Sequence, residues 1–286
     1  MNVNFWLIQA FNGLSYGALL FLVGSGLSLI FGVMRIVNLS HGSYFLLGGY
    51  VALTVIWTTG SWALSIPLAA LAIGAVGLVM ERVFLRPLGF DPLRQVLLTV
   101  GFAFLFQQAA LDIWTGNNFD INPPAMLAKS IQVGGLFLPL YRIFMIATAA
   151  AVGLVLWLAM EKTRIGAAVR ATVDDAQMAR GVGIDTSRIS MLIFALGAFL
   201  AAMGGVIGGG FLGIYPGLDF EILPLAFAVV IIGGMGSLGG AAIGALLVGL
   251  ADNFGKALFP EVSYFTLYAP MAVILAVKPT GLFGRE

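Results

Sequence analysis

Most side chains able to bind or couple to a partner lie in two polar stretches. Residues 161–189 hold nine of the 27 charged residues (14 basic plus 13 acidic). The second stretch, around the only histidine, comprises Asn38, Ser40, His41 and Gly42. The chain has no cysteine and no second histidine, and no carboxylate pair lies inside an apolar run, so neither a zinc site nor acid–base catalysis is supported. The two stretches therefore indicate binding or coupling, and we expect no metal or other cofactor.

The rest of the chain is apolar. Hydrophobic residues make up 60% of it and charged residues 9%, whereas an ordinary soluble domain carries about 25% charged residues. A membrane span needs roughly 20 apolar residues, and several charge-free runs are long enough for one helix or two. The composition therefore predicts an all-α, polytopic transmembrane bundle, a single domain over residues 1–286. A net charge of +1 without any basic block gives no indication of nucleic acid, and membrane lipid is the expected surrounding.

The positions of the polar breaks predict about 8–10 spans. The expected spans are 5–31, a second that follows the 38–42 break and ends near Trp57, a third that ends at Met80, then 95–114, 140–160, 190–212, 223–236, 238–255 and 264–278. Residues 81–94 are expected to form a charged loop, and 116–132 a polar, non-helical loop.

Glycines are dense near the end of the chain. Small residues permit close helix packing in lipid, and a run this dense also predicts a broken or re-entrant helix covered by protein or by a cavity. The residues expected to pack helices are Gly233, Gly234, Gly236, Gly239 and Gly240.

The distribution of Lys and Arg predicts the orientation of the chain. Basic residues concentrate in 81–94, in 161–189 and in the tail, which carries Lys278 and Arg285. Under the positive-inside rule these three segments are cytoplasmic, and counting spans places the N-terminus outside.

The long polar stretch is expected to contain a short helix. Thr172 to Asp175 resemble a capping box, and Gly181 and Gly183 supply a C-terminal stop. The surface expected to dock on another protein consists of Arg170, Asp174, Asp175, Ala179, Gly183 and Ile184. An ordinary positive-inside loop remains the alternative for this stretch.

Other polar residues also have two interpretations. If the break at 38–42 lies within the bilayer, Asn38, Ser40, His41 and Gly42 would line a translocation path, because polar groups at that depth face the bundle or water. If it lies at the membrane surface, they merely end a helix. Asp252 is either a proton-relay carboxylate or, as we favour, an interfacial residue beside Lys256.

Three segments resemble a known family. RATVDDAQMARGVGI resembles the cytoplasmic coupling loop of bacterial ABC-importer permeases. GLSLIFGVMRIVNLSHGSYFLLGGYVAL and FAVVIIGGMGSLGGAAIGALLVG resemble the first and last signature segments of permeases of the branched-chain amino acid importers. Their spacing matches over nearly the whole chain, and the length suits the smaller of the two permease types.

This resemblance implies a non-enzymatic permease subunit in a bacterial inner membrane. Its partners would be a longer paralogous permease, two cytoplasmic ATP-binding subunits and a periplasmic or extracellular substrate-binding protein. The chain itself contains no GxxxxGK[ST] phosphate-binding loop, so ATP hydrolysis is expected in the partner subunits. The cargo would be branched-chain amino acids or similar small polar solutes, since relatives carry urea and amides.

Two other classes remain open. A secondary transporter coupled to protons or sodium would act without ATPases and would depend on a carboxylate within the membrane. The sequence places few carboxylates there, which argues against it. An intramembrane enzyme would need a catalytic constellation, and the sequence shows none.

Overall fold

A computed structural model describes residues 3–89 and 91–284. These residues form eleven α-helices and a small β-hairpin. The helices are α1 (Val3–Met34), α2 (His41–Thr59), α3 (Trp62–Val79), α4 (Pro92–Trp114), α5 (Leu140–Lys162), α6 (Arg164–Asp174), α7 (Ala176–Gly181), α8 (Thr186–Leu212), α9 (Leu218–Gly233), α10 (Leu238–Leu258) and α11 (Ser263–Val277). The hairpin pairs β1 (Ser130–Val133) with β2 (Leu136–Pro139) in antiparallel register.

Six described helical segments are long and apolar enough to cross a membrane. They are α1, α4, α5, α8, α10 and a segment of α3 that extends to Leu88. The predicted all-α polytopic bundle is therefore confirmed. Helices α2, α9 and α11, of 19, 16 and 15 residues, are the other apolar helices of the bundle.

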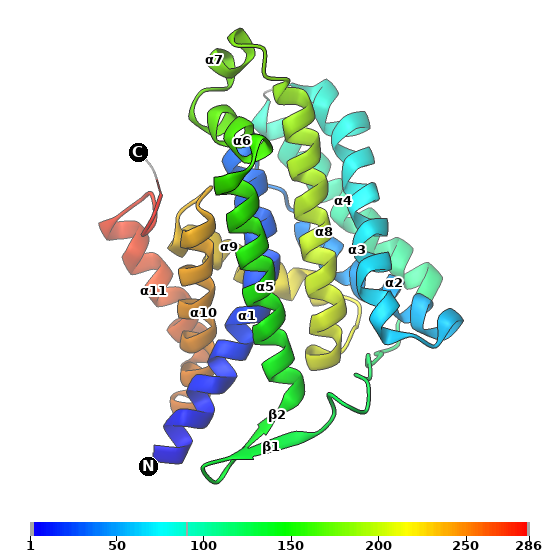
Figure 1. Cartoon of the computed structure of the whole chain (residues 1–286), viewed down its shortest axis with the longest axis vertical. Coiled ribbons are helices and arrows are strands. Elements are labelled where there is room, and N and C mark those ends of the chain that lie inside the picture. Colours follow the sequence, from blue (N-terminus) through cyan, green and yellow to red (C-terminus); the bar gives the residue numbers. More distant parts are fainter. Residues whose placement is uncertain (1–2, 90, 285–286) are drawn as a thin grey trace.

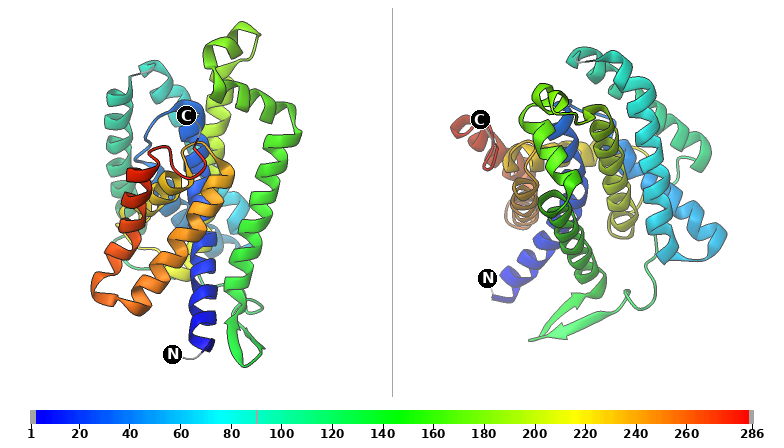
Figure 2. Two further views of the ribbon diagram at one scale, coloured as in Figure 1. Left: turned by 90° about the vertical axis from the view of Figure 1, so that its left-hand side faces the viewer. Right: turned by 45° about the horizontal axis from the view of Figure 1, so that its top comes forward.

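The molecule has two distinct ends (Figure 1). Helices α6 and α7 lie at one end, which we call the α6–α7 end, while the N-terminal part of α1 and the β-hairpin lie at the other, the hairpin end. The turn from α3 to α4 and the last described residues lie towards the α6–α7 end (Figures 1 and 2). The three segments that we predicted to share one side of the membrane thus share one end, although Arg285 itself lies outside the described residues.

Backbone contacts at glycines bring the central helices of the bundle close together. Helices α1 and α8 are its most buried spans, with 78% and 72% of their apolar windows buried, against 17% for α4 and α5. A Cβ added at Gly205 of α8 would lie 1.9 Å from the carbonyl oxygen of Phe45 in α2. One at Gly26 of α1 would lie 2.6 Å from the carbonyl oxygen of Gly197. Only glycine allows these helices to approach so closely.

The predicted charged loop at 81–94 is wrong in its first half. The helix continues as a π-helical turn, Met80–Leu85, and a 3-10 turn, Arg86–Leu88. Buried Glu81 forms an ion pair of 3.0 Å with Arg86, which lets a carboxylate remain inside a helical segment. The chain leaves the helix only at Gly89, where φ is 62°.

The predicted N-cap at Thr172 is also wrong, because this stretch forms two helices. Thr163 caps α6 by accepting from the amide of Gly166 at 3.0 Å. Thr172 lies inside α6 and its hydroxyl donates to the carbonyl of Ala168. Asp175 then caps α7, accepting from the amides of Gln177 and Met178 at 2.8 and 3.0 Å. The predicted glycine stop is confirmed at Gly183, where φ is 89°.

Two predicted breaks are present. The 38–42 break separates α1 from α2, and Gly234 and Gly236, with φ of 104° and 80°, separate α9 from α10. Residues 116–132 are mostly non-helical, as expected, but the β-hairpin that follows was not predicted.

Candidate functional site

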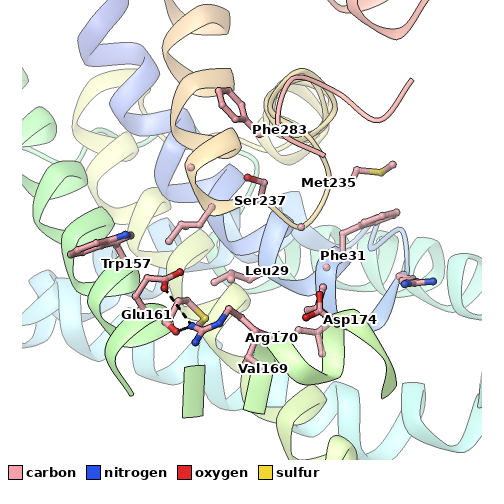
Figure 3. A pocket seen from close by; sticks show the side chains of 18 residues that line it. Leu29, Phe31, Trp157, Glu161, Val169, Arg170, Asp174, Met235, Ser237 and Phe283 are labelled. Carbon is pink, nitrogen blue, oxygen red and sulfur yellow. Dashed lines mark hydrogen bonds and ion pairs between the residues drawn. The ribbon is translucent and has the colours of Figure 1, made fainter. Parts of the chain in front are cut away.

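A cavity of about 670 Å³ opens at the α6–α7 end of the bundle. Figure 3 shows its walls, which come from four separate parts of the chain, the last of them represented by Phe283 near the C-terminus. Leu29 and Phe31 belong to the end of α1, Trp157 and Glu161 to α5, and Ser237 to the break before α10. The cavity thus lies where α6 meets the ends of the central helices.

Charged side chains of α5 and α6 line one wall. Arg170 donates to the carbonyl of Met160 and forms an ion pair of 3.9 Å with Glu161, so it ties α6 to the end of α5. Asp174 faces the same cavity (Figure 3). Arg35 also lines it, from a left-handed conformation with φ of 55° that non-glycine residues rarely adopt.

The opposite wall is the glycine-rich break between α9 and α10. A Cβ at Gly236 would lie 2.9 Å from the Cα of Gly32, at the end of α1. Gly233 and Gly240 touch across the break, and Gly234 touches the backbone of Gly284. Of the five glycines expected to pack helices, these four make close backbone contacts, and that of Gly234 is with the C-terminal tail rather than with a helix. Gly239 does not: a Cβ there would meet nothing within 4 Å, and this residue lines the cavity instead.

Helix α7 presents apolar side chains away from the bundle. Met178 is 71% exposed and Val182 78% exposed, although they stand in the most charged part of the chain. Ala179 is buried beneath them, and its carbonyl accepts from the amide of Ile184 at 2.9 Å. Sequence reasoning missed both exposed residues because it treated the charges, rather than the apolar side chains between them, as the contact surface.

The six residues expected to form one docking surface therefore have different roles. Arg170 and Asp174 line the cavity, and Asp175 caps α7. Ala179, Gly183 and Ile184 shape the turn from α7 into α8.

The break at 38–42 lies deep inside the bundle. Asn38, Ser40 and His41 are all 0% exposed, and the hydroxyl of Ser40 donates to Asn38 Oδ1 at 2.7 Å. His41 Nε2 lies 3.0 Å from the carbonyl oxygen of Val23. Val23 precedes the end of α1 by 11 residues, so His41 stands about 16 Å below that end. These residues therefore lie inside the bundle rather than on its exposed surface.

A buried carboxylate, Asp219, joins this region and was missed from the sequence. It is 2% exposed, and the hydroxyl of Ser43 donates to its Oδ2 at 3.1 Å. A Cβ at Gly42 would lie 2.3 Å from the Asp219 carbonyl oxygen, so the first turns of α2 and α9 are in contact. In the sequence, Asp219 stands beside Glu221 at the edge of an apolar run and is typical of an interfacial residue.

The buried carboxylates weaken the sequence-based argument against a secondary transporter, which rested on the scarcity of carboxylates within the membrane. Glu81, Asp219 and Asp252 are 2%, 2% and 7% exposed, so carboxylates within the bundle are not scarce. Asp252 forms an ion pair of 2.7 Å with Lys256, in agreement with the favoured interpretation. Asp219 makes no ion pair with any described residue.

Comparison with known proteins identifies the family. The model for the family "Branched-chain amino acid transport system / permease component" matches residues 9–275. The permease protein BraD of a high-affinity branched-chain amino acid transport system in Pseudomonas aeruginosa is 30% identical, over 98% of this chain and 96% of BraD. The corresponding LivH protein of Salmonella typhimurium is 31% identical, with the same coverage of each chain.

A second type of permease is also similar. LivM of Salmonella typhimurium is 25% identical, over 91% of this chain and 67% of LivM. No solved structure is significantly similar to the chain. The match over almost the whole length shows that the chain belongs to the family of branched-chain amino acid transport permeases and is an integral membrane transport subunit, not an enzyme.

Proposed function

We propose that this chain is one of two permease subunits of an ATP-driven importer of branched-chain amino acids or similar small polar solutes. The relatives BraD and LivH are named for branched-chain amino acid transport, which supports this cargo. LivM-type permeases are the model for the second permease. Two cytoplasmic ATP-binding subunits and a periplasmic or extracellular binding protein complete the proposed complex, in the bacterial inner membrane.

The observation that carries the proposal is the exposed apolar surface of α7. Met178 and Val182 protrude from a charged segment at one end of a membrane bundle. Single exposed apolar residues are normal, but two on one short, firmly capped turn suit the groove of a protein partner. On the proposed topology this end is cytoplasmic, as is the C-terminus, and the partner is an ATP-binding subunit.

The proposed transmission runs from α7 through α6 to the central helices. Movement of the ATP-binding subunits pushes α7, and α6 moves with it because Asp175 joins the two helices. Arg170 carries this movement to the end of α5. Across the cavity lie the end of α1 and the α9–α10 break, whose displacement would change access to the path.

In this proposal Asn38, Ser40, His41 and Gly42 line the translocation path. Their depth supports it, because polar side chains inside a membrane bundle face either a partner or water. They are closed off in this structure, as an alternating-access path is for part of its cycle.

A matched pair of methionine variants tests the docking surface. Met178 and Met126 are 71% and 78% exposed, and Met126 lies in the loop that precedes the hairpin. Met178→Asp should lower the recovery of ATP-binding subunits with the tagged chain about tenfold, as a loss of about 1.4 kcal/mol of binding free energy would. Met126→Asp should leave recovery unchanged. Equal recovery with both variants would refute docking through α7.

A secondary transporter remains the alternative, and one observation favours it. Asp219 is a buried carboxylate without an ion-pair partner among the described residues, as an ion-coupled carrier requires. Under that mechanism the chain would transport without ATP-binding subunits.

A further inference from the structure

Buried polar atoms without partners gather at the start of α2. Within the described ranges, five buried side-chain atoms lack a hydrogen-bond partner: Asn38 Nδ2, His41 Nδ1, Tyr50 Oη, Trp62 Nε1 and Asp219 Oδ1. Three of them belong to the residues that surround the first turn of α2. Folded proteins leave few such groups unpaired, and each one calls for an explanation such as a ligand.

The unpaired atoms include both donors and acceptors. The amide group Nδ2 of Asn38 is a donor only, and Asp219 Oδ1 is an acceptor. The carbonyl of Val23 can only accept, so His41 Nε2 carries the proton of the neutral ring and Nδ1 is left as an acceptor. A ligand that satisfies this set must bring an acceptor to Asn38 and donors to His41 and Asp219.

Helix geometry adds a separate attraction for negative charge. Helix α2 begins at His41, and its N-cap residue Ser40 makes no side-chain capping bond. Instead the Ser40 hydroxyl donates to Asn38 Oδ1, which leaves Asn38 Nδ2 pointing elsewhere. The positive end of a helix that begins inside a membrane protein favours the anionic group of a substrate.

The contacts of Asp219 indicate where the cationic group of a ligand would bind. Ser43 holds Asp219 Oδ2 at 3.1 Å, and no described Lys, Arg or His nitrogen lies within ion-pairing distance of the carboxylate. Backbone amides at the start of α9 interact with this carboxylate but carry no full charge, so a cation at the site would stabilise it further. A primary ammonium group supplies three donors for this purpose.

Buried aliphatic residues flank Asp219 along α9. Leu218 and Ile222, on the same turn of α9, are each 1% exposed, and Leu223 lies against Gly42 of α2. A branched hydrocarbon side chain is compatible with these neighbours, whereas a second charge on the ligand would remain unpaired there.

We propose that the first turns of α2 and α9 form a binding site for the zwitterion of an aliphatic α-amino acid. Asp219, held by Ser43, accepts hydrogen bonds from the ammonium group, while Asn38 Nδ2 donates to the carboxylate, which the positive end of α2 also attracts. This inference rests on the proposed function and names the substrate contacts on the path. The site is closed in this structure and opens as the first turns of α2 and α9 separate.

The absence of cysteine makes a direct test possible. In the purified complex during ATP turnover, Ser43→Cys should react about tenfold faster with a cationic methanethiosulfonate (ethylammonium) than with an anionic one (ethylsulfonate), because Asp219 attracts the cation. Adding Asp219→Asn should abolish this preference, and leucine should slow the reaction. Ser65→Cys is the matched control, since Ser65 is equally buried but in α3, and leucine should not protect it.

Uptake by the unmodified complex separates the two proposals. If that complex imports leucine, but Ser43→Cys shows neither charge preference nor protection by leucine, the binding site is wrong and the proposed function stands. If that complex imports no leucine, the amino acid site is wrong, and the proposed function fails as well if no other branched-chain amino acid or small polar solute is imported.

Should Ser43→Cys not assemble, Asp219→Asn and Asp219→Glu carry the test. Asp219→Asn should raise the KM for leucine about tenfold while ATP hydrolysis continues, and Asp219→Glu should restore part of the loss. An unchanged KM in Asp219→Asn would overturn the site.

Discussion

The shape of α7, the helix proposed to dock on an ATP-binding subunit, depends on one side chain, that of Asp175. Its carboxylate accepts two amides at the start of α7, a helix of only six residues. A helix this short has little stability of its own, so its shape in the free protein depends on the cap and on the turn into α8.

Replacing Asp175 by Ala should therefore weaken coupling without preventing membrane insertion. Loss of an N-cap costs about 1 kcal/mol, enough to fray α7. Uptake per ATP hydrolysed should fall in reconstituted vesicles, whereas Asp175→Asn, which keeps the cap, should retain most of it. Charge reversal at Asp175 or Arg170 should abolish transport. Normal uptake by Asp175→Ala would mean that α7 does not transmit force.

The ion pair of Glu81 and Arg86 stabilises the end of the helical segment that follows α3. Glu81 is 2% exposed, and Arg86 also donates to the carbonyl of Ser187 at 3.1 Å, which ties the end of α3 to the start of α8. Arg86→Met should lower stability by about 1–3 kcal/mol, because it leaves a buried carboxylate unpaired. The additional change Glu81→Gln should recover part of that loss. Thermal unfolding in detergent measures the stability of the single and the double variant. Equal unfolding midpoints for the wild type and both variants would contradict a stabilising role of the Glu81–Arg86 ion pair.

Contact between α2 and α8 depends on glycine along a whole helix face. A Cβ at Gly205 would meet the backbone of Phe45 at 1.9 Å, and one at Gly48 would meet Ala202 at 2.5 Å. Backbone atoms cannot move aside as flexible side chains can, so the two helices would have to separate.

Gly205→Ala should accordingly destabilise the bundle by about 1–3 kcal/mol, the usual cost of overpacking. Gly101→Ala in α4 is the matched control, since a Cβ there meets nothing within 4 Å and alanine favours the helix. The thermal midpoint of the purified protein should fall only for Gly205→Ala. If both variants unfold at the wild-type temperature, the close contact is not needed for stability.

The sequence predicted the apolar helices and both breaks, because hydropathy and glycine density report directly on them. It did not predict that Met80–Leu88 stays helical, since a buried ion pair depends on which residues meet after folding. It placed the cap at Thr172 rather than at Thr163 and Asp175, because similar capping residues stand close together there. Asp219 was missed for a related reason: only the tertiary contact with Ser43 distinguishes it from an acid at the membrane surface.

The complete bundle joins three features along one axis. The exposed turn of α7 and the cavity beside α6 lie at one end, and the buried polar residues at the start of α2 lie deeper inside. The peripheral helices α4 and α5 have only 17% of their apolar windows buried, which leaves wide faces for lipid or for the second permease. This arrangement suits a subunit that receives movement from a partner outside the membrane.

The most direct test is to purify the tagged chain in mild detergent from its native host and to reconstitute what accompanies it. We predict a second permease and two ATP-binding subunits in the preparation. Leucine uptake into vesicles should require ATP and the binding protein and should persist when the proton gradient is collapsed. Recovery of the chain alone, with uptake that stops when the proton gradient is removed, would contradict the importer and indicate an ion-coupled carrier centred on Asp219.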